Sequence, residues 1–313
     1  MRTTAANHSG FGAGLKSSLV EITLFAKIRR WRWLIAWAVT LLLLGMFLVW
    51  EVGGILMAPT NAPIGALPAH LPVQDVTFPS ASGATIHGWW VPGQPGRGVV
   101  VLMHGIHANR RAMITRAMFL TRAGYAVLLF DFQGHGESLG EHITFGYLES
   151  RDVTAAVQFV HAKCPGEKVA LLGISLGAVA TLLAEPPLPV QAMILESSYP
   201  TIYQATENRL VVRLGWLGKP ITPLLTCQLK PRLGVSPEDL RPIEHARKIT
   251  VPKFFIAGTV DPNTTLPESQ ALFDAAAEPK QFWAVEGAGH VDMHGFAKAE
   301  YERRILEFLA GRM

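Results

Sequence analysis

The segment at residues 168–177, KVALLGISLG, combines the signs of a strand, a sharp corner and a helix. An apolar, β-prone run ends at Gly173 and an Ala- and Leu-rich helical pattern begins at Leu176, which leaves Ser175 on the corner itself. Such a corner imposes strained backbone angles on its central residue, and flanking glycines make room because they lack a Cβ atom. The G-x-S-x-G pattern between strand and helix is typical of a nucleophile elbow. The alternative is a small-residue turn in which Ser175 is only a helix N-cap.

The region 73–313 alternates strand-like and helix-like patterns. Strand-like runs are predicted at 73–78, 84–91, 98–104, 125–131, 168–172, 190–195, 252–257 and 280–285. Helical patterns fall between the later runs, at about 110–123, 149–163, 176–185, 266–277 and 296–310. Two successive strands followed by repeated β–α alternation predict an α/β fold, with a mostly parallel sheet between two layers of helices.

The interval from Tyr199 to Thr250 breaks this alternation, because it holds helical pieces at 201–214 and 219–230 but no strand-like run. Functional sites of open α/β sheets lie at the carboxyl ends of the strands. We therefore predict a helical insertion at about 199–250 that caps the site. Its Pro, Trp and Leu content is equally compatible with ordinary packing.

A nucleophilic serine needs a base within hydrogen-bond reach, and the base needs a carboxylate that holds its tautomer. In the elbow architecture these partners follow the serine in the order acid, then histidine. His290 follows the last strand-like run in a glycine-rich loop, and Asp261 follows the run at 252–257. We predict that both act with Ser175. The less well placed alternatives are His245 and His294 for the base and Asp292 and Glu286 for the acid.

Acyl transfer also requires N–H donors for the oxyanion of the tetrahedral intermediate. Leu176 follows the candidate nucleophile at a helix N-terminus and offers one backbone N–H. The loop after the third strand-like run, in VVVLMHGIHANR, offers a second from Ile106. His104 lies just before this position and is predicted to brace the loop rather than to catalyse.

Four stretches together resemble the α/β-hydrolase superfamily, specifically its serine-aminopeptidase-like and esterase-like members: LMHGIHANR, FDFQGHGESLGE, GISLG, and GTVDPNT with GAGHVD. The resemblance covers residues 73–313 and implies the α/β-hydrolase fold and Ser–Asp–His chemistry. The chain departs from lipase-type relatives in having HG-x instead of a run of glycines at the oxyanion loop. It also has Gln133 where many relatives have arginine.

The resulting prediction is a serine hydrolase that cleaves an ester, thioester or amide through an acyl-enzyme. Its expected substrate is a small-molecule or lipid-like acyl compound, and neither a metal nor a cofactor is expected. A catalytically silent protein of the same fold, used for binding or as a scaffold, is the alternative. His290, Asp292 and His294 form an H-x-D-x-H pattern that is weak evidence for a metal site. Cys164 and Cys227 can pair only if the fold brings them together.

The positive charge of the chain is concentrated at its N-terminus. Residues 1–32 hold six of the 28 Lys and Arg residues and one of the 24 acidic residues, which leaves 22 basic and 23 acidic residues in the remainder. A nearly neutral body is unlike the basic surface of a nucleic-acid-binding protein. No nucleic-acid partner is therefore expected.

Residues 33–50, WLIAWAVTLLLLGMFLVW, form an uncharged apolar run. At about 1.5 Å per residue, a helix of this length spans roughly 27 Å, close to the thickness of a bilayer core. We predict a single-pass transmembrane helix followed by a Pro- and Gly-rich tether at 51–72. A cleaved signal peptide and a buried core helix are the alternatives. Residues 1–32 are basic and residues 51–96 contain no Lys or Arg, which predicts a cytoplasmic N-terminus and a periplasmic or otherwise extracytoplasmic hydrolase domain.

Overall fold

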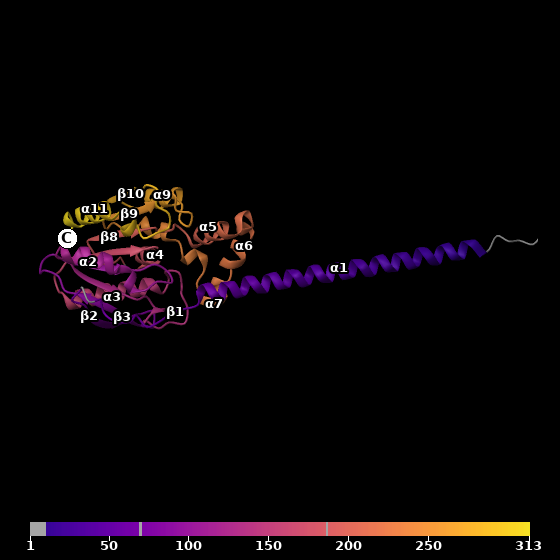
Figure 1. The fold of residues 1–313 in the computed structure, drawn as a ribbon, viewed down its shortest axis with the longest axis horizontal. Coiled ribbons are helices and arrows are strands. Elements are labelled where there is room, and N and C mark those ends of the chain that lie inside the picture. The colour runs from indigo at the N-terminus through magenta and orange to yellow at the C-terminus, as the bar shows by residue number, and fades with distance from the viewer. Residues whose placement is uncertain (1–10, 69–70, 186) are drawn as a thin grey trace, which may run out of the picture. The chain divides into compact units, whose positions relative to one another are not determined.

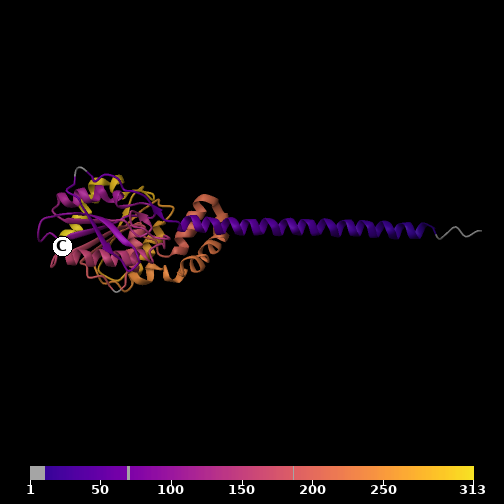
Figure 2. The same cartoon turned by 90° about the horizontal axis from the view of Figure 1, so that it is seen from below.

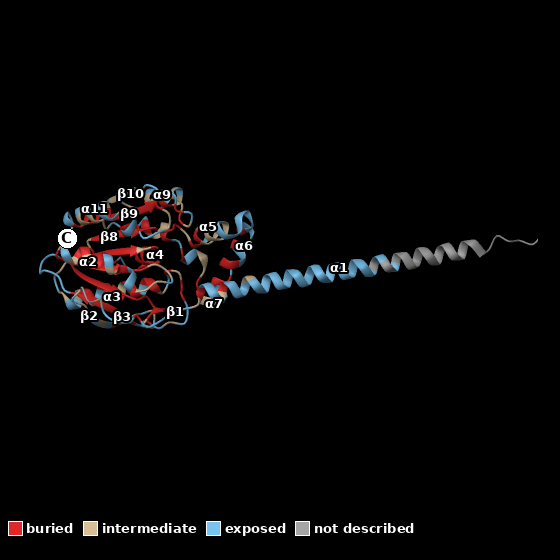
Figure 3. Cartoon of the chain, in the orientation of Figure 1, coloured by how far each residue is buried: buried red, intermediate tan, exposed pale blue. Residues whose placement is uncertain are grey.

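The computed structural model describes residues 11–68, 71–185 and 187–313, which divide between two compact units, Met1–Val52 and Gly53–Met313. The first ten residues of the predicted cytoplasmic segment lie outside the described residues. Helix α1 (Phe11–Met57) runs through the first unit and into the start of the second (Figure 1). Its side chains from residue 29 to residue 48 are exposed (Figure 3). The stretch Arg29–Met57 is long and apolar enough to cross a membrane, judged by length and composition alone.

The segment 51–72, expected to be a tether, has regular structure in its first half. Helix α1 continues to Met57, since no proline interrupts the sequence until residue 59. Strand β1 (Thr60–Asn61) then pairs in parallel with β6 (His135–Gly136). The sequence gives no local sign of this pairing because its two strands lie about 75 residues apart. Residues 53–68 thus belong structurally to the second unit.

One eight-stranded sheet organises the second unit, in the order β10-β9-β8-β7-β4-β5-β3-β2. Its strands are β2 (Gln74–Pro79), β3 (Thr85–Val91), β4 (Val99–Met103), β5 (Ala126–Phe130), β7 (Val169–Ile174), β8 (Ala192–Glu196), β9 (Lys253–Gly258) and β10 (Lys280–Val285). The β2–β3 and β3–β5 pairs are antiparallel and the others are parallel. All eight predicted strands are therefore present.

Two layers of helices cover the sheet (Figure 2). Helices α3 (Glu149–Lys163), α4 (Leu176–Leu183), α8 (Pro242–Ala246) and α9 (Leu266–Ala275) contribute to the core on one face. Helices α2 (Ile114–Arg122) and α11 (Lys298–Ala310) contribute to the core on the other, and two short elements, η1 (Arg110–Met113) and α10 (Met293–Phe296), precede them. Along β4, Val99, Val101 and Met103 join the first core while Val100 and Leu102 join the second. A strand that is buried on both faces has a continuous run of apolar residues in its sequence. This run is why β4 can be predicted from the sequence.

The predicted insertion is helical and lies between β8 and β9. It consists of α5 (Ile202–Leu214), η2 (Gly215–Leu217), α6 (Gly218–Thr226), α7 (Leu229–Leu233) and η3 (Pro237–Asp239), and it leads into α8. Helices α5 and α6 pack side by side (Figure 1). A separate apolar cluster joins Ile202, Ala205 and Leu229 of the insertion to Val179 and Leu183 of α4. The insertion is thus packed against the helix that follows the serine corner.

Candidate active site

Ser175 occupies a strained corner between β7 and α4. Its φ of 50° and ψ of −104° lie where a residue with a side chain is rarely found, and its N–H donates to Glu196 O at 2.8 Å. A Cβ atom on Gly173 would lie 2.4 Å from Gly177 C, and one on Gly177 would lie 2.6 Å from Met103 O. Both glycines of the motif are therefore required by close backbone packing, as the sequence predicted.

Asp261 and His290 meet in the loops that follow β9 and β10. His290 Nδ1 lies 2.7 Å from Asp261 Oδ2, and Asp261 Oδ1 accepts from the N–H groups of Asn263 at 2.8 Å and Thr264 at 3.0 Å. A carboxylate only accepts, so Nδ1 donates and Nε2 is left as the basic nitrogen. Asp261 is buried and His290 is partly exposed. Because β7, β9 and β10 are parallel, these two residues and Ser175 share the carboxyl edge of the sheet.

No hydrogen bond joins Ser175 Oγ to His290 in the described part of the chain. Catalytic hydrogen bonds are often long in a ligand-free enzyme and tighten when substrate binds. The structure therefore contains one of the two links that a Ser–His–Asp triad requires.

The alternative acids and bases have other partners. Asp292 forms an ion pair with Arg116 at 2.8 Å, and Glu286 is exposed. His294 is buried, with Nδ1 3.2 Å from Thr115 Oγ1 and Nε2 2.9 Å from Glu302 Oε1. His290, Asp292 and His294 thus point to three separate partners. No group of three His, Cys, Asp or Glu side chains suited to a metal occurs among the described residues. Cys164 and Cys227 are both free thiols.

The loop after β4 carries the second candidate oxyanion donor. His104 is fully buried, with Nδ1 2.7 Å from Gly105 O, and its Nε2 accepts from Phe132 N–H at 3.2 Å. Burial lowers the pKa of His104 to about 3, with a smaller contribution from nearby His135. A neutral ring with both nitrogens engaged braces the loop, as predicted. The N–H of Ile106 donates to no acceptor within the residues that the structure describes.

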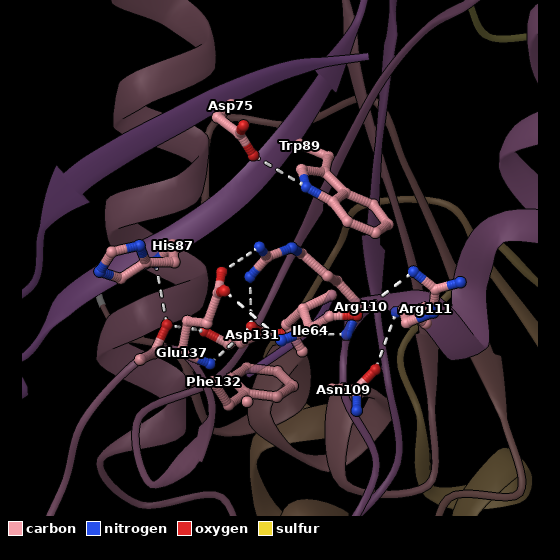
Figure 4. A network of polar contacts seen from close by, with 12 residues as sticks. Ile64, Asp75, His87, Trp89, Asn109, Arg110, Arg111, Asp131, Phe132 and Glu137 are labelled. Carbon is pink, nitrogen blue, oxygen red and sulfur yellow. Dashed lines mark hydrogen bonds and ion pairs between the residues drawn. The ribbon is translucent and has the colours of Figure 1, made fainter. Parts of the chain in front are cut away.

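A buried arginine fixes the far end of the same loop (Figure 4). Arg110 contacts the carboxylates of Asp131 and Glu137 through its guanidinium, and its backbone N–H donates to Asp131 Oδ1 at 2.6 Å. The guanidinium also lies over the ring of Trp89, whose Nε1–H donates to Asp75 Oδ1 at 3.0 Å. These contacts tie the loop after β4 to β2, β3 and the end of β5. Ile106 is therefore held from both sides, by His104 and by Arg110.

Gln133 is a neutral side chain that connects Glu149 to the backbone at His142. Its Nε2 donates to Glu149 Oε1 at 2.7 Å and to His142 O at 2.8 Å. Glu149 also accepts from the N–H groups of Thr144 at 2.9 Å and Gly146 at 2.8 Å. The buried carboxylate is thus satisfied by neutral donors, and the loop before α3 is held without an ion pair.

A pocket of about 250 Å³ opens beside the serine, entirely within the second unit. Ser175 lines it together with Ile106 and Leu176, the two predicted oxyanion donors. The remaining lining is mostly apolar and comes from the end of α1, the loop after β4, the loop before α3, the insertion and its flanks: Gly53, Leu56, Met57, His107, Phe145, Tyr199, Ile202, Ala205, Thr206, Arg209, Leu210, Arg213, Leu225, Thr226 and Leu229. The insertion therefore forms a large part of the wall.

Sequence reasoning missed two parts of this pocket. The first is Gly53–Met57, which the sequence places in the tether. The second is the arginine pair Arg209 and Arg213 of α5. Their four-residue spacing predicts that they lie on one helix face, and the sequence carries no other sign that both line a pocket.

Comparisons of the sequence point to hydrolases. Residues 94–239 match the family model described as Serine aminopeptidase, S33. The chain is 29% identical over 252 residues to the uncharacterized protein Rv2307c of Mycobacterium tuberculosis, an alignment that covers 79% of this chain and 83% of that protein. It is 26% identical over 240 residues to caffeoylshikimate esterase of Arabidopsis thaliana, covering 64% and 72% of the two proteins.

Solved structures show the same fold. The esterase Pf2001 of Pyrococcus furiosus superposes with a TM-score of 0.69 at 22% identity, over 82% of this chain and 98% of that one. An esterase from Exiguobacterium antarcticum superposes with a TM-score of 0.57 at 17% identity, over 76% and 100% of the two chains. The chain therefore has the α/β-hydrolase fold with a long helical insertion, which confirms the predicted fold class.

Proposed function

We propose that this protein is a serine hydrolase that forms an acyl-enzyme on Ser175, with Asp261 and His290 as its partners. The observation that carries the proposal is the 2.7 Å contact of His290 Nδ1 with Asp261 Oδ2, at the sheet edge where Ser175 occupies its strained corner. The similarity to esterases makes an ester the preferred substrate class. The mostly apolar pocket suits a small-molecule or lipid-like acyl chain.

The proposed reaction proceeds in two halves. His290 Nε2 takes the hydroxyl proton of Ser175 while Oγ attacks the acyl carbon, and Asp261 stabilises the resulting imidazolium. The N–H groups of Ile106 and Leu176 donate to the oxyanion, a contribution of about 10²- to 10³-fold in rate for each donor. His290 then gives its proton to the leaving alkoxide. Water repeats the sequence on the acyl-enzyme, which releases the acid and restores the serine.

A fluorophosphonate probe tests the nucleophile. The wild-type protein should be labelled and Ser175→Ala should not, because the probe forms a bond to an activated serine Oγ. Asp261→Asn should fold and react more slowly by roughly two to four orders of magnitude, because the amide favours the wrong tautomer of His290. Equal labelling of Ser175→Ala would exclude this assignment.

The second candidate function is a catalytically silent binding or scaffold protein of the same fold. The pairing of Asp261 with His290 disfavours it, because a binding protein has no need of an oriented imidazole. A panel of esters, thioesters and aminoacyl amides of graded chain length decides between the two functions. No turnover of any compound, with no probe labelling, would favour the silent protein.

We also propose that the apolar part of α1 anchors the enzyme in a membrane, with the N-terminus in the cytoplasm and the hydrolase unit on the far side. Its support is the one stretch of spanning length among the described residues, Arg29–Met57, and the one-sided distribution of basic residues around it.

A further inference from the structure

Two arginines interrupt the apolar wall of the pocket beside Ser175. Arg209 and Arg213 lie one turn apart on α5, and both line the pocket. Among the lining residues that the structure describes, they are the two with permanently charged side chains. A cation beside an apolar acyl site is costly unless something neutralises it.

Arg209 has no carboxylate partner within the described residues. Its Nη1 donates to Ala205 O at 2.8 Å and lies 3.5 Å from Asn263 O, while Nε and Nη2 make no hydrogen bond in that part of the chain. Its side chain is partly buried, and this burial lowers the pKa of the guanidinium because the charged form loses hydration. Two donors at adjacent nitrogens are thus left for a ligand.

The two buried arginines outside the pocket behave differently. Arg110 pairs with two carboxylates, and Arg116 pairs with Glu196 and Asp292. Both fully buried arginines of the described structure are therefore neutralised by carboxylates. Arg209, which is partly buried, lies in the pocket without such an ion pair.

Asp261 and Glu268 act on the charge of Arg209 electrostatically without an ion pair to it, and both carboxylates are already engaged. Asp261 accepts from His290 and from two backbone N–H groups. Glu268 accepts from Asn208 Nδ2 at 2.6 Å and from Thr265 N–H at 3.0 Å. The segment 208–237 of the insertion contains five Lys and Arg residues and no Asp or Glu. Glu207, Glu238 and Asp239, which flank this segment, form no ion pair with Arg209 in the part of the chain that the structure describes.

Arg213 extends the same cationic surface outward. Its side chain is exposed, and Nη1 lies 3.4 Å from Arg209 O without an ion pair to any residue that the structure describes. A guanidinium fork binds the two oxygens of a carboxylate or phosphate side by side. Two forks one turn apart form a wider anion-binding surface than a single side chain.

We infer that the substrate of this pocket carries an anionic group, a carboxylate or a phosphate, on its apolar acyl chain, and that Arg209 and Arg213 bind it. This inference rests on the proposed function, since it places the acyl chain in the pocket that Ser175 lines. It selects amphiphilic anionic esters over neutral esters of the same length.

Two esters of equal chain length test the inference on the full-length protein in detergent. One is 4-nitrophenyl octanoate, and the other is the mono-4-nitrophenyl ester of octanedioic acid, which ends in a carboxylate. A third ester ending in a phosphonate separates carboxylate from phosphate recognition. The wild-type enzyme should prefer an anionic ester by about tenfold or more in kcat/KM, mainly through a lower KM.

Arg209→Met should reduce kcat/KM for the preferred anionic ester by about 10- to 100-fold. For the neutral ester, 4-nitrophenyl octanoate, the reduction should be far smaller. Arg213→Gln, an exposed change that leaves the core intact, should shift the preference in the same direction by a smaller factor. Arg97→Gln is the matched control. It removes an exposed arginine just before the first residue of β4, whereas Ser175 lies at the carboxyl ends of the parallel strands. This change should leave the preference for anionic esters unchanged.

Equal losses of Arg209→Met on the neutral and anionic esters would assign Arg209 a structural role and overturn the inference. So would a wild-type enzyme that is indifferent to substrate charge. A binding measurement separates this failure from failure of the proposed chemistry. Ser175→Ala should bind monomethyl octanedioate more tightly than methyl 8-hydroxyoctanoate, and this preference should disappear in Ser175→Ala/Arg209→Met. Equal or absent binding contradicts the inference whether or not Ser175 is the nucleophile.

Discussion

His104 is a single side chain whose protonation state affects the loop after β4 that it braces. In the folded protein its pKa is about 3, whereas an unfolded histidine titrates near 6.5. Below pH 6.5 the unfolded chain takes up a proton that the folded chain does not. The contribution of His104 to stability is therefore present above pH 6.5 and is lost as the pH falls toward 3.

The variant His104→Asn tests whether stability falls with pH in this direction. Between pH 7 and pH 5 the wild type should lose about 2 kcal/mol more unfolding free energy than His104→Asn. At pH 5 the unfolded ring of His104 is protonated and the folded ring is not, and pH 5 lies about 1.5 units below the pKa of the unfolded ring, at about 1.4 kcal/mol per unit. Urea unfolding of both proteins in detergent at pH 7, 6 and 5 measures the difference. Parallel pH profiles would show that His104 is not held neutral.

At the scale of elements, Arg116 connects helix α2 to the serine corner and to the loop that carries His290. Its Nη2 binds both oxygens of Glu196, at 2.9 and 3.0 Å, and its Nη1 binds Asp292 in the His290 loop. Glu196 ends β8 and accepts the N–H of Ser175 through its carbonyl oxygen. One guanidinium therefore links the serine corner and the histidine loop, which come from different strands.

Arg116→Met should be strongly destabilising. It leaves the carboxylate of Glu196 buried without its cation, and breaking such a pair costs about 3–5 kcal/mol. The double variant Arg116→Met/Glu196→Gln should recover part of this loss, because the uncompensated charge is gone. Urea unfolding of Arg116→Met, Glu196→Gln and the double variant gives the coupling energy between the two side chains. A loss below about 1 kcal/mol for Arg116→Met, or no recovery in the double variant, would contradict this account.

The elements that the sequence predicted correctly have local signatures. The central strands are apolar on both faces, and the positions of Ser175, Asp261 and His290 after strands follow from that pattern. The pairing of β1 with β6, the partners of Arg116 and the isolation of Arg209 depend on residues far apart in the chain. No local pattern encodes them, because each is decided by which loops the sheet order brings together.

At the scale of the whole molecule, the second compact unit begins at Gly53, whereas the hydrolase domain is predicted to begin at residue 73. Met57 is buried, and its carbonyl oxygen accepts from Ile143 N–H at 2.8 Å. Ile64 is buried as well. A truncated form that begins at Pro72, which the predicted tether would allow, lacks both side chains.

A form that begins at Gly53 should therefore keep its fold and its reaction with the fluorophosphonate probe. The form that begins at Pro72 should be less stable by several kcal/mol, since the loss of one buried large side chain costs about 2–5 kcal/mol. Thermal unfolding and probe labelling of the two forms make the comparison. Equal melting temperatures would restore the predicted boundary.

The orientation of α1 across the membrane determines on which side the hydrolase unit lies. The stretch Arg29–Met57 is about 44 Å long as a helix, enough to cross a bilayer core of roughly 30 Å with residues to spare. Five basic residues lie within about 20 positions before Trp33, and none lies between residues 51 and 96. Short flanks rich in Lys and Arg stay in the cytoplasm, so the hydrolase unit should lie on the opposite side.

Protease added outside intact cells or spheroplasts should consequently digest the hydrolase unit and leave an N-terminal epitope tag protected. Lysed cells are the control, in which both the tag and the unit should be cleaved. A hydrolase unit that is protected until lysis would reverse the orientation. Recovery of a soluble mature form that begins between residues 58 and 66 would instead identify the segment as a signal peptide. An uncleaved anchor requires the full-length chain to stay with the membrane after an alkaline wash.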